Sequence, residues 1–222
     1  MVCLYQTTQS ETMVDMPRNG SHTRARLLDA AELLVERNGF AATSVDAILE
    51  EAGSSKGAFF HHFSSKRELT QALVARYVDT DLGMLQQGLD AAADVDDPAE
   101  KVLAFLSFYE KWADELVTAD SACLYIALVT EQNLLDEVSS AEIRRAVAGW
   151  REGFAALLRP ALERCGVGSA EIDVEELADH LFATFEGGYM LCRALGSPDP
   201  MRVQLRVYRQ LVDRLIQGRP TP

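Results

Sequence analysis

The sequence lacks the features that define several classes of protein. Its four cysteines are far apart and form no CxxC pair, and residues 1–21 show no basic segment followed by an apolar one. A disulfide scaffold and a secretory signal are therefore not predicted, and we expect a reduced, cytoplasmic protein. Charged residues interrupt every hydrophobic stretch before the roughly 20 residues that a membrane helix needs. We expect no membrane partner.

Catalytic and metal-binding motifs are also missing. The sequence contains no GxSxG, HExxH, glycine-rich phosphate loop or DxDxDG motif. Of the four histidines, His22, His61 and His62 lie in the N-terminal third of the chain, in the arm or in the segment 44–63, so a histidine-based triad would need His180. His61 and His62 are adjacent, and neighbouring helical residues point about 100° apart, which is poor geometry for a metal pair without a third ligand. We predict no enzyme, no metal and no cofactor.

Basic residues are scarce, and their distribution matters more than their number. The net charge of −13 argues at first against a nucleic-acid partner, because DNA is held mainly by lysine and arginine. The charge balance is −1 over residues 1–21, −2 over 22–82 and −10 over 83–222. The nearly neutral segment 22–82 is therefore compatible with a local DNA-binding face on an acidic protein.

What the chain does contain is an ordinary globular composition, 48% hydrophobic and 25% charged, with apolar residues spaced three and four apart. No segment alternates with period two over six residues. We predict an all-α protein of about nine helices and no internal repeat. The expected helices cover residues 23–38, 45–52, a short piece within 54–63, 66–82, 99–117, 121–135, 139–165, 174–195 and 201–216. Residues 1–21 read as a mobile arm, with Met1, Met13 or Met16 as the start.

Residues 44–63 have the arrangement that a helix-turn-helix needs. A short helix ends at Gly53, where glycine permits a sharp turn, and a second short helix follows. The second helix of such a unit presents its first residues to base edges in the major groove. Phe59 and Phe63, four residues apart, are expected to face inward and hold this helix on its domain. Ser54, Ser55, Lys56 and Gly57 are suited to phosphate and guanine contacts.

The run from Thr43 to Leu69, with Ala52-Gly53-Ser54-Ser55-Lys56-Gly57 at its centre and Gly39-Phe40 before it, resembles the DNA-binding domain of TetR-family transcriptional regulators. The resemblance spans about 50 residues. Beyond it, the chain matches that family in length and helix count only. It implies an N-terminal three-helix DNA-binding domain over residues 22–68 and a helical ligand-binding and dimerisation domain over residues 69–222.

The same resemblance implies roles for eight residues. The positions that touch base edges and thymine methyls are Lys56, Gly57, Phe60 and His61. The positions that contact phosphate are Ser44, Ser55, His62 and Lys66. Two residues depart from the family pattern: Phe60 replaces a tyrosine and loses a phosphate-binding hydroxyl, and Ser54 replaces a valine. Lys66 also has an ordinary interpretation as a solvated residue, although a cation at a helix start opposes the helix dipole and hints at an external anion.

Aromatic residues in the C-terminal part have two interpretations, as core or as the lining of the inducer cavity that the family has there. Trp112, Tyr125 and Phe154 are the preferred lining residues because they lie mid-helix beside smaller ones. Cys123 is the fourth residue predicted for this pocket. Cys123 is expected at a helix start, where the dipole lowers a thiol pKa. It would then sense oxidants or electrophiles, or else be a small buried hydrophobe.

The apolar stripes of residues 174–195 and 201–216 have two interpretations, as ordinary core helices or as the helix pair that they resemble, through which TetR-family proteins dimerise. The residues predicted for that interface are Leu181, Phe185, Gly188, Leu205, Tyr208 and Val212. The resulting hypothesis is a homodimeric repressor that a small-molecule inducer releases from a palindromic operator in double-stranded DNA. A thiol-sensing repressor acting through Cys123, and an activator in place of a repressor, stay open as alternatives.

Overall fold

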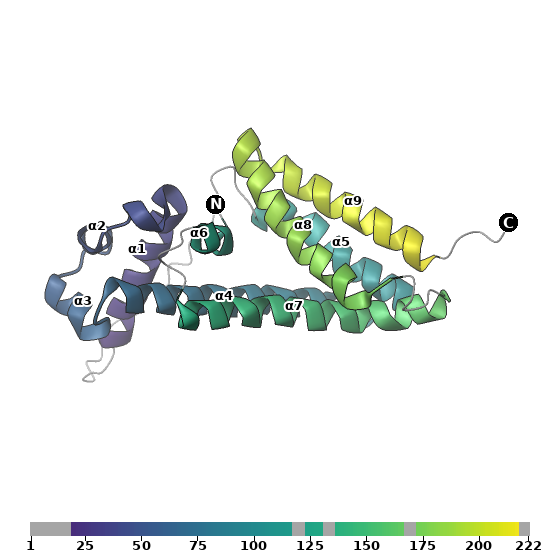
Figure 1. Ribbon diagram of the computed structural model, residues 1–222, viewed down its shortest axis with the longest axis horizontal. Coiled ribbons are helices and arrows are strands. Elements are labelled where there is room, and N and C mark those ends of the chain that lie inside the picture. The colour runs from purple at the N-terminus through teal and green to yellow at the C-terminus, as the bar shows by residue number, and fades with distance from the viewer. Residues whose placement is uncertain (1–18, 117–122, 131–135, 167–171, 218–222) are drawn as a thin grey trace, which may run out of the picture.

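The computed structural model describes residues 19–116, 123–130, 136–166 and 172–217, and these contain nine α-helices and no strand. The helices are α1 (Asn19–Ala42), α2 (Val45–Glu51), α3 (Lys56–His62), α4 (Lys66–Ala91), α5 (Pro98–Leu116), α6 (Leu124–Thr130), α7 (Glu137–Arg164), α8 (Val174–Leu195) and α9 (Asp199–Ile216). The molecule is elongated: α1–α3 form one end, α5, α8 and α9 the other, and α4 and α7 run side by side between them (Figure 1). The predicted all-α class is confirmed.

Several helix boundaries differ from those predicted. The first helix begins at Asn19, so residues 19–21 belong to it and not to the predicted arm, while residues 1–18, with the alternative starts, lie outside the described residues. The helix predicted over 121–135 is described as α6 and covers the middle of that range, with 121–122 and 131–135 outside the described residues. Gly39 ends the regular part of α1 as predicted, with φ of 78°.

Helix α4 is nine residues longer than the 66–82 predicted, and it reaches Ala91. Gly83 and Gly88 lower the intrinsic helix propensity of this stretch, which is why the sequence pattern suggested an earlier end. Tertiary packing overrides that preference, because Gly88 lies under Tyr109 and a Cβ there would collide with the tyrosine hydroxyl. The same hydroxyl donates to the carbonyl of Met84 at 2.9 Å. The domain boundary predicted between residues 68 and 69 thus falls inside one continuous helix.

Side-chain caps fix where most of the helices begin. The side chains of five residues each accept a hydrogen bond from a backbone N–H of the first turn: Ser44, Ser55, Ser65, Asp136 and Asp173. Each such cap stabilises its helix by about 1 kcal/mol. For α2 and α3, which have seven residues each, the caps matter most because helices this short are unstable alone.

The core consists of two hydrophobic clusters. The first joins α1–α3 with the first half of α4, and it also includes Leu124, Tyr125 and Leu128 of α6. The second joins the far half of α4 with α5, α7, α8 and α9. Helix α6 therefore lies within the C-terminal part in sequence, between α5 and α7, but packs on α1. This contact links the end that carries the helix-turn-helix to the rest of the molecule.

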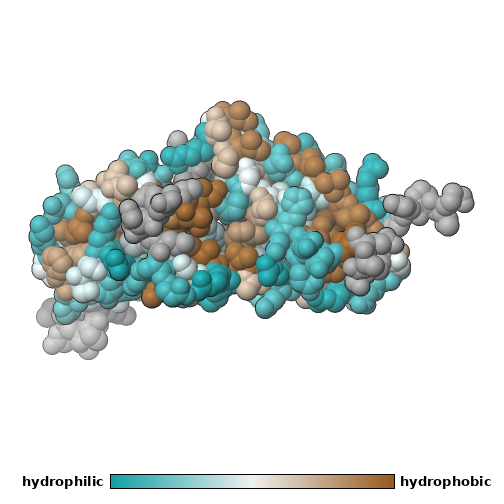
Figure 2. Space-filling view, in the orientation of Figure 1, coloured by the Kyte–Doolittle hydropathy of each residue, from teal (hydrophilic) through white to brown (hydrophobic). Residues whose placement is uncertain are grey.

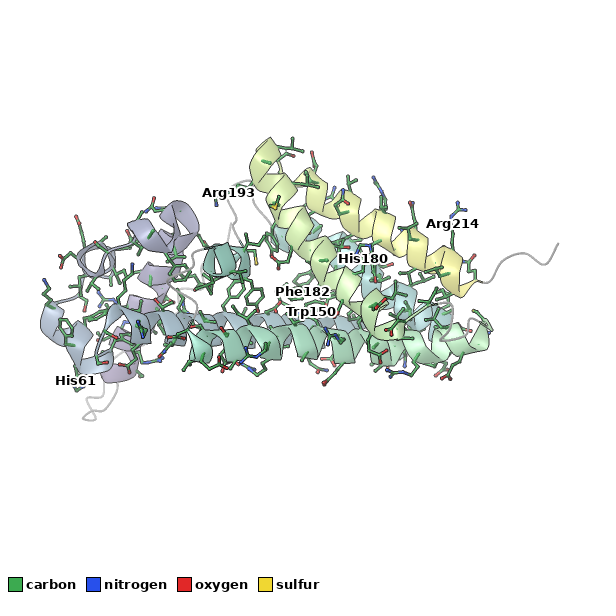
Figure 3. All side chains as sticks on the ribbon, viewed as in Figure 1. His61, Trp150, His180, Phe182, Arg193 and Arg214 are labelled. Atoms are coloured by element: carbon green, nitrogen blue, oxygen red, sulfur yellow. The ribbon has the colours of Figure 1, made fainter. Side chains whose placement is uncertain are left out.

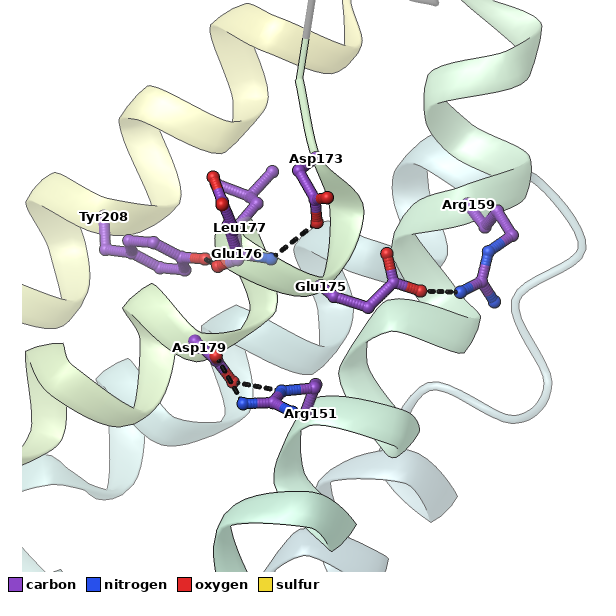
Figure 4. A network of polar contacts seen from close by, with 8 residues as sticks. All are labelled: Arg151, Arg159, Asp173, Glu175, Glu176, Leu177, Asp179 and Tyr208. Atoms are coloured by element: carbon purple, nitrogen blue, oxygen red, sulfur yellow. Dashed lines mark hydrogen bonds and ion pairs between the residues drawn. The ribbon is translucent and has the colours of Figure 1, made fainter. Parts of the chain in front are cut away.

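Polar contacts fix the relative positions of α7, α8 and α9 (Figure 4). The guanidinium of Arg151 donates to both carboxylate oxygens of Asp179, at 2.6 and 2.7 Å. The hydroxyl of Tyr208 donates to the carbonyl of Leu177 at 2.6 Å. The ion pair is half exposed and contributes at most about 1 kcal/mol, so its role is chiefly to set helix register. No helix in the described part of the chain is long and apolar enough to span a bilayer.

Candidate functional site

Contacts with α1 stabilise the turn between α2 and α3. Gly53 occupies the left-handed region with φ of 54°, which favours glycine, and the backbone N–H of Ser54 bonds to the carbonyl of Leu49 at 2.9 Å. The guanidinium of Arg26 donates to the carbonyls of Ala52 and Gly53. The angle between α2 and α3 is therefore fixed by α1 and by backbone geometry.

Two phenylalanines anchor α3. Phe59 and Phe63 are fully buried with ring centroids 5.7 Å apart, as their spacing predicted. Burial of two such rings contributes roughly 4 to 6 kcal/mol of hydrophobic stabilisation, which compensates for the shortness of the helix. One side of α3 is thus committed to the core, and the opposite side is free to meet a partner.

The outward side of α3 carries the residues predicted to touch bases. Lys56, Gly57, Phe60 and His61 are all exposed, and Phe60 has 56% of its surface accessible. His61 lies at the outer tip of the molecule (Figure 3). The ammonium of Lys56 forms an ion pair with Asp46 at 3.2 Å, and both side chains are largely exposed. Such a pair contributes little stability and is readily exchanged for a guanine or a phosphate.

The residues predicted to contact phosphate surround this face. Ser44 and Ser55 accept hydrogen bonds as helix caps, and a hydroxyl that accepts is still able to donate. His62 is half-buried. The ammonium of Lys66 donates to the carbonyl of Phe40 at 2.8 Å. This internal partner occupies one of the three ammonium donors of Lys66 and stabilises a cation at the start of α4, so the phosphate contact stays a prediction.

A cavity of about 200 Å³ lies where the two hydrophobic clusters meet. Its walls come from α1, α4, α6, α7 and α8, and five of its lining residues are Tyr77, Tyr125, Trp150, Phe182 and Tyr189. Trp150 and Phe182 lie close together in the middle of the molecule, well away from His61 (Figure 3). The cavity is therefore remote from the outward face of α3. It is bounded in part by α4, the helix that begins beside α3.

Two carboxyl groups enter this cavity from α4 and α8. Asp81 accepts from the Tyr125 hydroxyl at 2.8 Å and from the Trp150 indole N–H at 3.1 Å. Burial raises the pKa of Asp81, against the opposing effect of those two hydrogen bonds. Burial also raises the pKa of Glu186 to about 7, with a smaller contribution from the charge of Asp81. The sequence analysis did not identify Asp81 or Glu186 as site residues. The position of Asp81, four residues after Tyr77 on an apolar stripe, was the one sequence feature that pointed to it.

Of the four residues predicted for the pocket, Tyr125 lines the cavity, whereas Trp112, Cys123 and Phe154 do not. Phe154 is fully buried in the second cluster, stacked on Phe105 with centroids 5.1 Å apart. Trp112 is 43% exposed and stacks on Phe108 at the surface. Both predictions were wrong because position in mid-helix does not determine which side of the helix faces the cavity.

The structure also corrects the prediction for Cys123. The thiol is buried, and burial together with the neighbouring Glu186 raises its pKa far above the ordinary value. Its sulfur donates to Glu186 Oε1 at 3.2 Å. The residue does precede α6, but desolvation outweighs the dipole of so short a helix. A thiol in this state is protonated at neutral pH and is a poor sensor of oxidants.

We expect Cys123 to resist alkylation in the folded protein. Native protein treated with iodoacetamide at pH 7.5 should show Cys123 unmodified by peptide mass spectrometry, because a buried protonated thiol is a weak nucleophile. Protein unfolded in guanidinium should be modified at the same residue to completion. Rapid labelling of Cys123 in native protein would contradict the burial and restore the thiol-sensing alternative.

The residues predicted for the dimer interface belong instead to the core of a single chain. All six are buried within the protomer: Leu181, Phe185, Gly188, Leu205, Tyr208 and Val212. They form the face along which α8 and α9 pack on each other and on α5 and α7. A side chain already covered by its own chain offers no surface to a second one, so this prediction was wrong at the level of residues.

The opposite faces of the same helices carry exposed hydrophobic residues. Those with the largest exposure are Met190, Leu191, Leu195, Val203, Val207 and Leu211. We call these six residues the α8–α9 apolar face. Hydrophobic atoms gather at the adjoining ends of α8 and α9 at the top of the molecule (Figure 2). A contiguous patch of this kind on an otherwise charged surface marks a site of protein association.

No three histidine, cysteine, aspartate or glutamate side chains within the described ranges are grouped so as to hold a metal ion. His61 and His62 lie edge to face with ring centroids 4.9 Å apart. The described residues thus form three distinct features: an exposed helix with Lys56, His61 and His62 at one end, an aromatic cavity in the middle and an apolar face at the other end.

Family models match both parts of the chain. Residues 27–73 match the model described as bacterial regulatory proteins, tetR family, and residues 98–208 match the tetracyclin repressor-like C-terminal domain. The first match contains α2, α3 and the start of α4. The second contains most of the cavity and nearly all of the α8–α9 apolar face.

Individual relatives agree with these matches. The transcriptional regulator AcuR of Cereibacter sphaeroides is 30% identical, with 82% of each chain covered. The regulator TtgR of Pseudomonas putida is 29% identical over 80% of this chain and 82% of its own. A TetR regulatory protein of Rhodobacter sphaeroides has a similar structure, with a TM-score of 0.68, 25% identity and coverage of 85% and 97%. The chain thus belongs to the TetR family and is a DNA-binding transcriptional regulator.

Proposed function

We propose that the protein is a homodimeric repressor that binds a palindromic operator and is released from it by a small molecule entering the central cavity. The observation that carries this proposal is the continuity of α4. The helix starts against α3 and extends to the cavity, where it supplies Tyr77, Thr80 and Asp81. One rigid element therefore connects a ligand site to the DNA-binding end.

The α8–α9 apolar face is proposed as the dimer interface. One seven-residue recognition helix makes too few contacts for useful specificity, whereas two related by a twofold axis read both halves of a palindrome. Val203, Val207 and Leu211 recur every four residues and so form one stripe along α9. Pairing that stripe and its neighbours on α8 with the same surface of a second chain buries both.

The coupling between the cavity and DNA is proposed to pass through α1 and α4. Arg76 of α4 forms ion pairs with Asp29 and Glu32 of α1, so the two helices move together. Glu36, one turn after Glu32, lines the cavity. A ligand there touches both helices that support α3. It releases DNA only to the extent that it binds the releasing conformation more tightly.

Selection from genomic DNA tests the proposal. Purified protein should recover fragments that share one palindrome, and Lys56→Ala should bind that palindrome about 10- to 100-fold more weakly, the loss expected when a guanine contact is removed. Lys111→Ala, which removes an exposed lysine of α5 far from α3, should leave affinity unchanged. A reporter whose promoter carries the palindrome should be silenced by the wild-type protein.

Recovery of no sequence above background at low salt would contradict the proposal. So would equal loss of affinity in Lys56→Ala and Lys111→Ala, because the change would then reflect overall charge and not the recognition helix. Activation of the reporter would establish the activator alternative.

A further inference from the structure

The central cavity has charge of one sign only. Three carboxyl side chains line it, from three different helices: Glu36 of α1, Asp81 of α4 and Glu186 of α8. Among the described residues that line it there is no lysine, arginine or histidine. A cavity built for an anion would need at least one such group, so the lining disfavours negatively charged ligands.

One carboxylate oxygen of Glu186 is left without a partner. Oε1 of Glu186 accepts the Cys123 thiol, while Oε2 is buried and has no hydrogen-bond partner in the part of the chain that the structure describes. Buried polar atoms are nearly always paired, and an unpaired one destabilises the fold. Because Glu186 lines the cavity, its carboxyl is satisfied when the cavity's occupant brings a donor or a positive charge to it.

Aromatic rings form the remaining walls. Tyr77 and Tyr125 meet edge to face with centroids 5.0 Å apart, and Tyr125 stacks on Phe182 at 5.9 Å. Trp150 contributes its indole, whose N–H is directed to Asp81. The faces of such rings attract cations through their quadrupoles, and carboxylates beside them add to that attraction. Aromatic walls together with acidic groups form a site for an organic cation.

We propose that the ligand of this cavity is a small organic cation with an apolar or aromatic body, such as a substituted amine or a quaternary ammonium compound. Its positive charge lies between Asp81 and Glu186, and its apolar part contacts the rings. The inference rests on the proposed function, since it names the chemical class of the releasing ligand. The volume of about 200 Å³ suits a compact molecule.

The carboxyls should respond to pH in a way that identifies them. The groups that face Glu186 are Cys123 before α6, Tyr125 of α6, Tyr77 and Asp81 of α4, and Tyr189 of its own helix. Glu36 of α1 shares the cavity, while two cations, Arg37 and Arg193, line a separate pocket. The raised pKa of Glu186, about 7, means that its carboxyl is increasingly protonated as pH falls below 7. Cation affinity should therefore decrease from pH 8 to pH 6.

Calorimetry with matched probes tests the charge preference. The full-length protein is titrated with benzyltrimethylammonium, its neutral isostere neopentylbenzene and the anion phenylacetate, and in parallel with benzylamine, its neutral isostere ethylbenzene and benzoate. We expect each cation to bind at least tenfold more tightly than its neutral and anionic partners. Glu186→Gln should weaken cation binding at least tenfold and remove most of its pH dependence, with little effect on the neutral compounds.

The control variant is Glu176→Gln, an exposed carboxyl on the same helix, which should behave as the wild type. The proposal is overturned if no cation binds more tightly than its isostere, or if Glu186→Gln and Glu176→Gln have the same cation affinity. Circular dichroism establishes that each variant is folded.

The same preparations are then tested for operator binding. If the protein binds its palindrome but shows no preference for cations, the proposed function is supported and the proposed ligand class is contradicted. If the protein prefers cations but selects no DNA sequence, the proposed ligand class is supported and the proposed repressor function is contradicted. Dissociation of the operator complex by the cations, and not by their isosteres, would support both.

Discussion

Changing Leu191 and Leu211 together to aspartate should convert the protein from a dimer to a monomer and weaken operator binding by about 100-fold or more. Both side chains belong to the α8–α9 apolar face and are exposed in the single chain. Aspartate there costs the protomer little, because the position is already in water, but it places unpaired charges inside the proposed interface. Loss of one of two linked half-site contacts accounts for the expected fall in affinity.

Analytical ultracentrifugation and DNA binding, measured on the same samples, check this expectation. Val138→Asp is a matched control, since Val138 is another exposed hydrophobic residue but lies on α7, outside the apolar face. The control should sediment as the wild type and bind DNA equally well. A double variant that stays dimeric would show that the interface lies elsewhere, and a monomer with full operator affinity would show that pairing is unnecessary for recognition.

The dimer prediction shows what periodicity does and does not determine. A spacing of three and four residues identifies an apolar face on α8 and α9, and the strongest such face includes Leu181, Phe185 and Leu205. The structure uses that face for the protomer's own core. A second, weaker stripe through Val203, Val207 and Leu211 is exposed. Sequence alone ranks the two faces by hydrophobicity but contains no information on which one meets a second chain.

The helix-turn-helix was predictable because its determinants are local. The caps Ser44 and Ser55, the left-handed Gly53 and the inward pair Phe59 and Phe63 all lie within 20 residues, and each acts through its immediate neighbours. Their identities therefore determine the shape of the segment almost independently of the rest of the chain. The outward residues of α3 follow directly from the inward ones, because the two sets occupy opposite sides of one helix.

The cavity was not predictable in the same way. Its carboxyls, Glu36, Asp81 and Glu186, are distant in sequence and meet only because α1, α4 and α8 converge. Glu36 has the pattern of an ordinary solvated residue on the polar side of α1. A side chain that points into a cavity and one that points into the core differ only slightly in direction around the helix axis. Sequence periodicity does not resolve so small a difference.

Phe154→Ala should lower the free energy of unfolding by about 3 to 5 kcal/mol, the usual cost of removing a fully buried ring. Phe154 is inaccessible to solvent, stacks on Phe105 and contacts Tyr208 across the second cluster, so its loss leaves a void at the centre of the helical body. Trp112→Ala should cost about 1 kcal/mol or less, because the indole is partly exposed and has one stacked neighbour. Urea unfolding of both variants at one protein concentration measures the difference.

A comparison of Phe154→Ala with Tyr125→Ala decides whether Phe154 belongs to the core or to the ligand site. Because Phe154 does not line the central cavity, Phe154→Ala at a temperature where it remains folded should bind benzyltrimethylammonium as the wild type does. Tyr125 does line the cavity, so Tyr125→Ala should weaken binding of benzyltrimethylammonium. The substitution also removes the hydroxyl that donates a hydrogen bond to Asp81. A fall in cation affinity in Phe154→Ala without a fall in stability would place this ring in the cavity wall. Loss of stability without loss of binding would separate the residues that maintain the helical body from those that recognise the ligand.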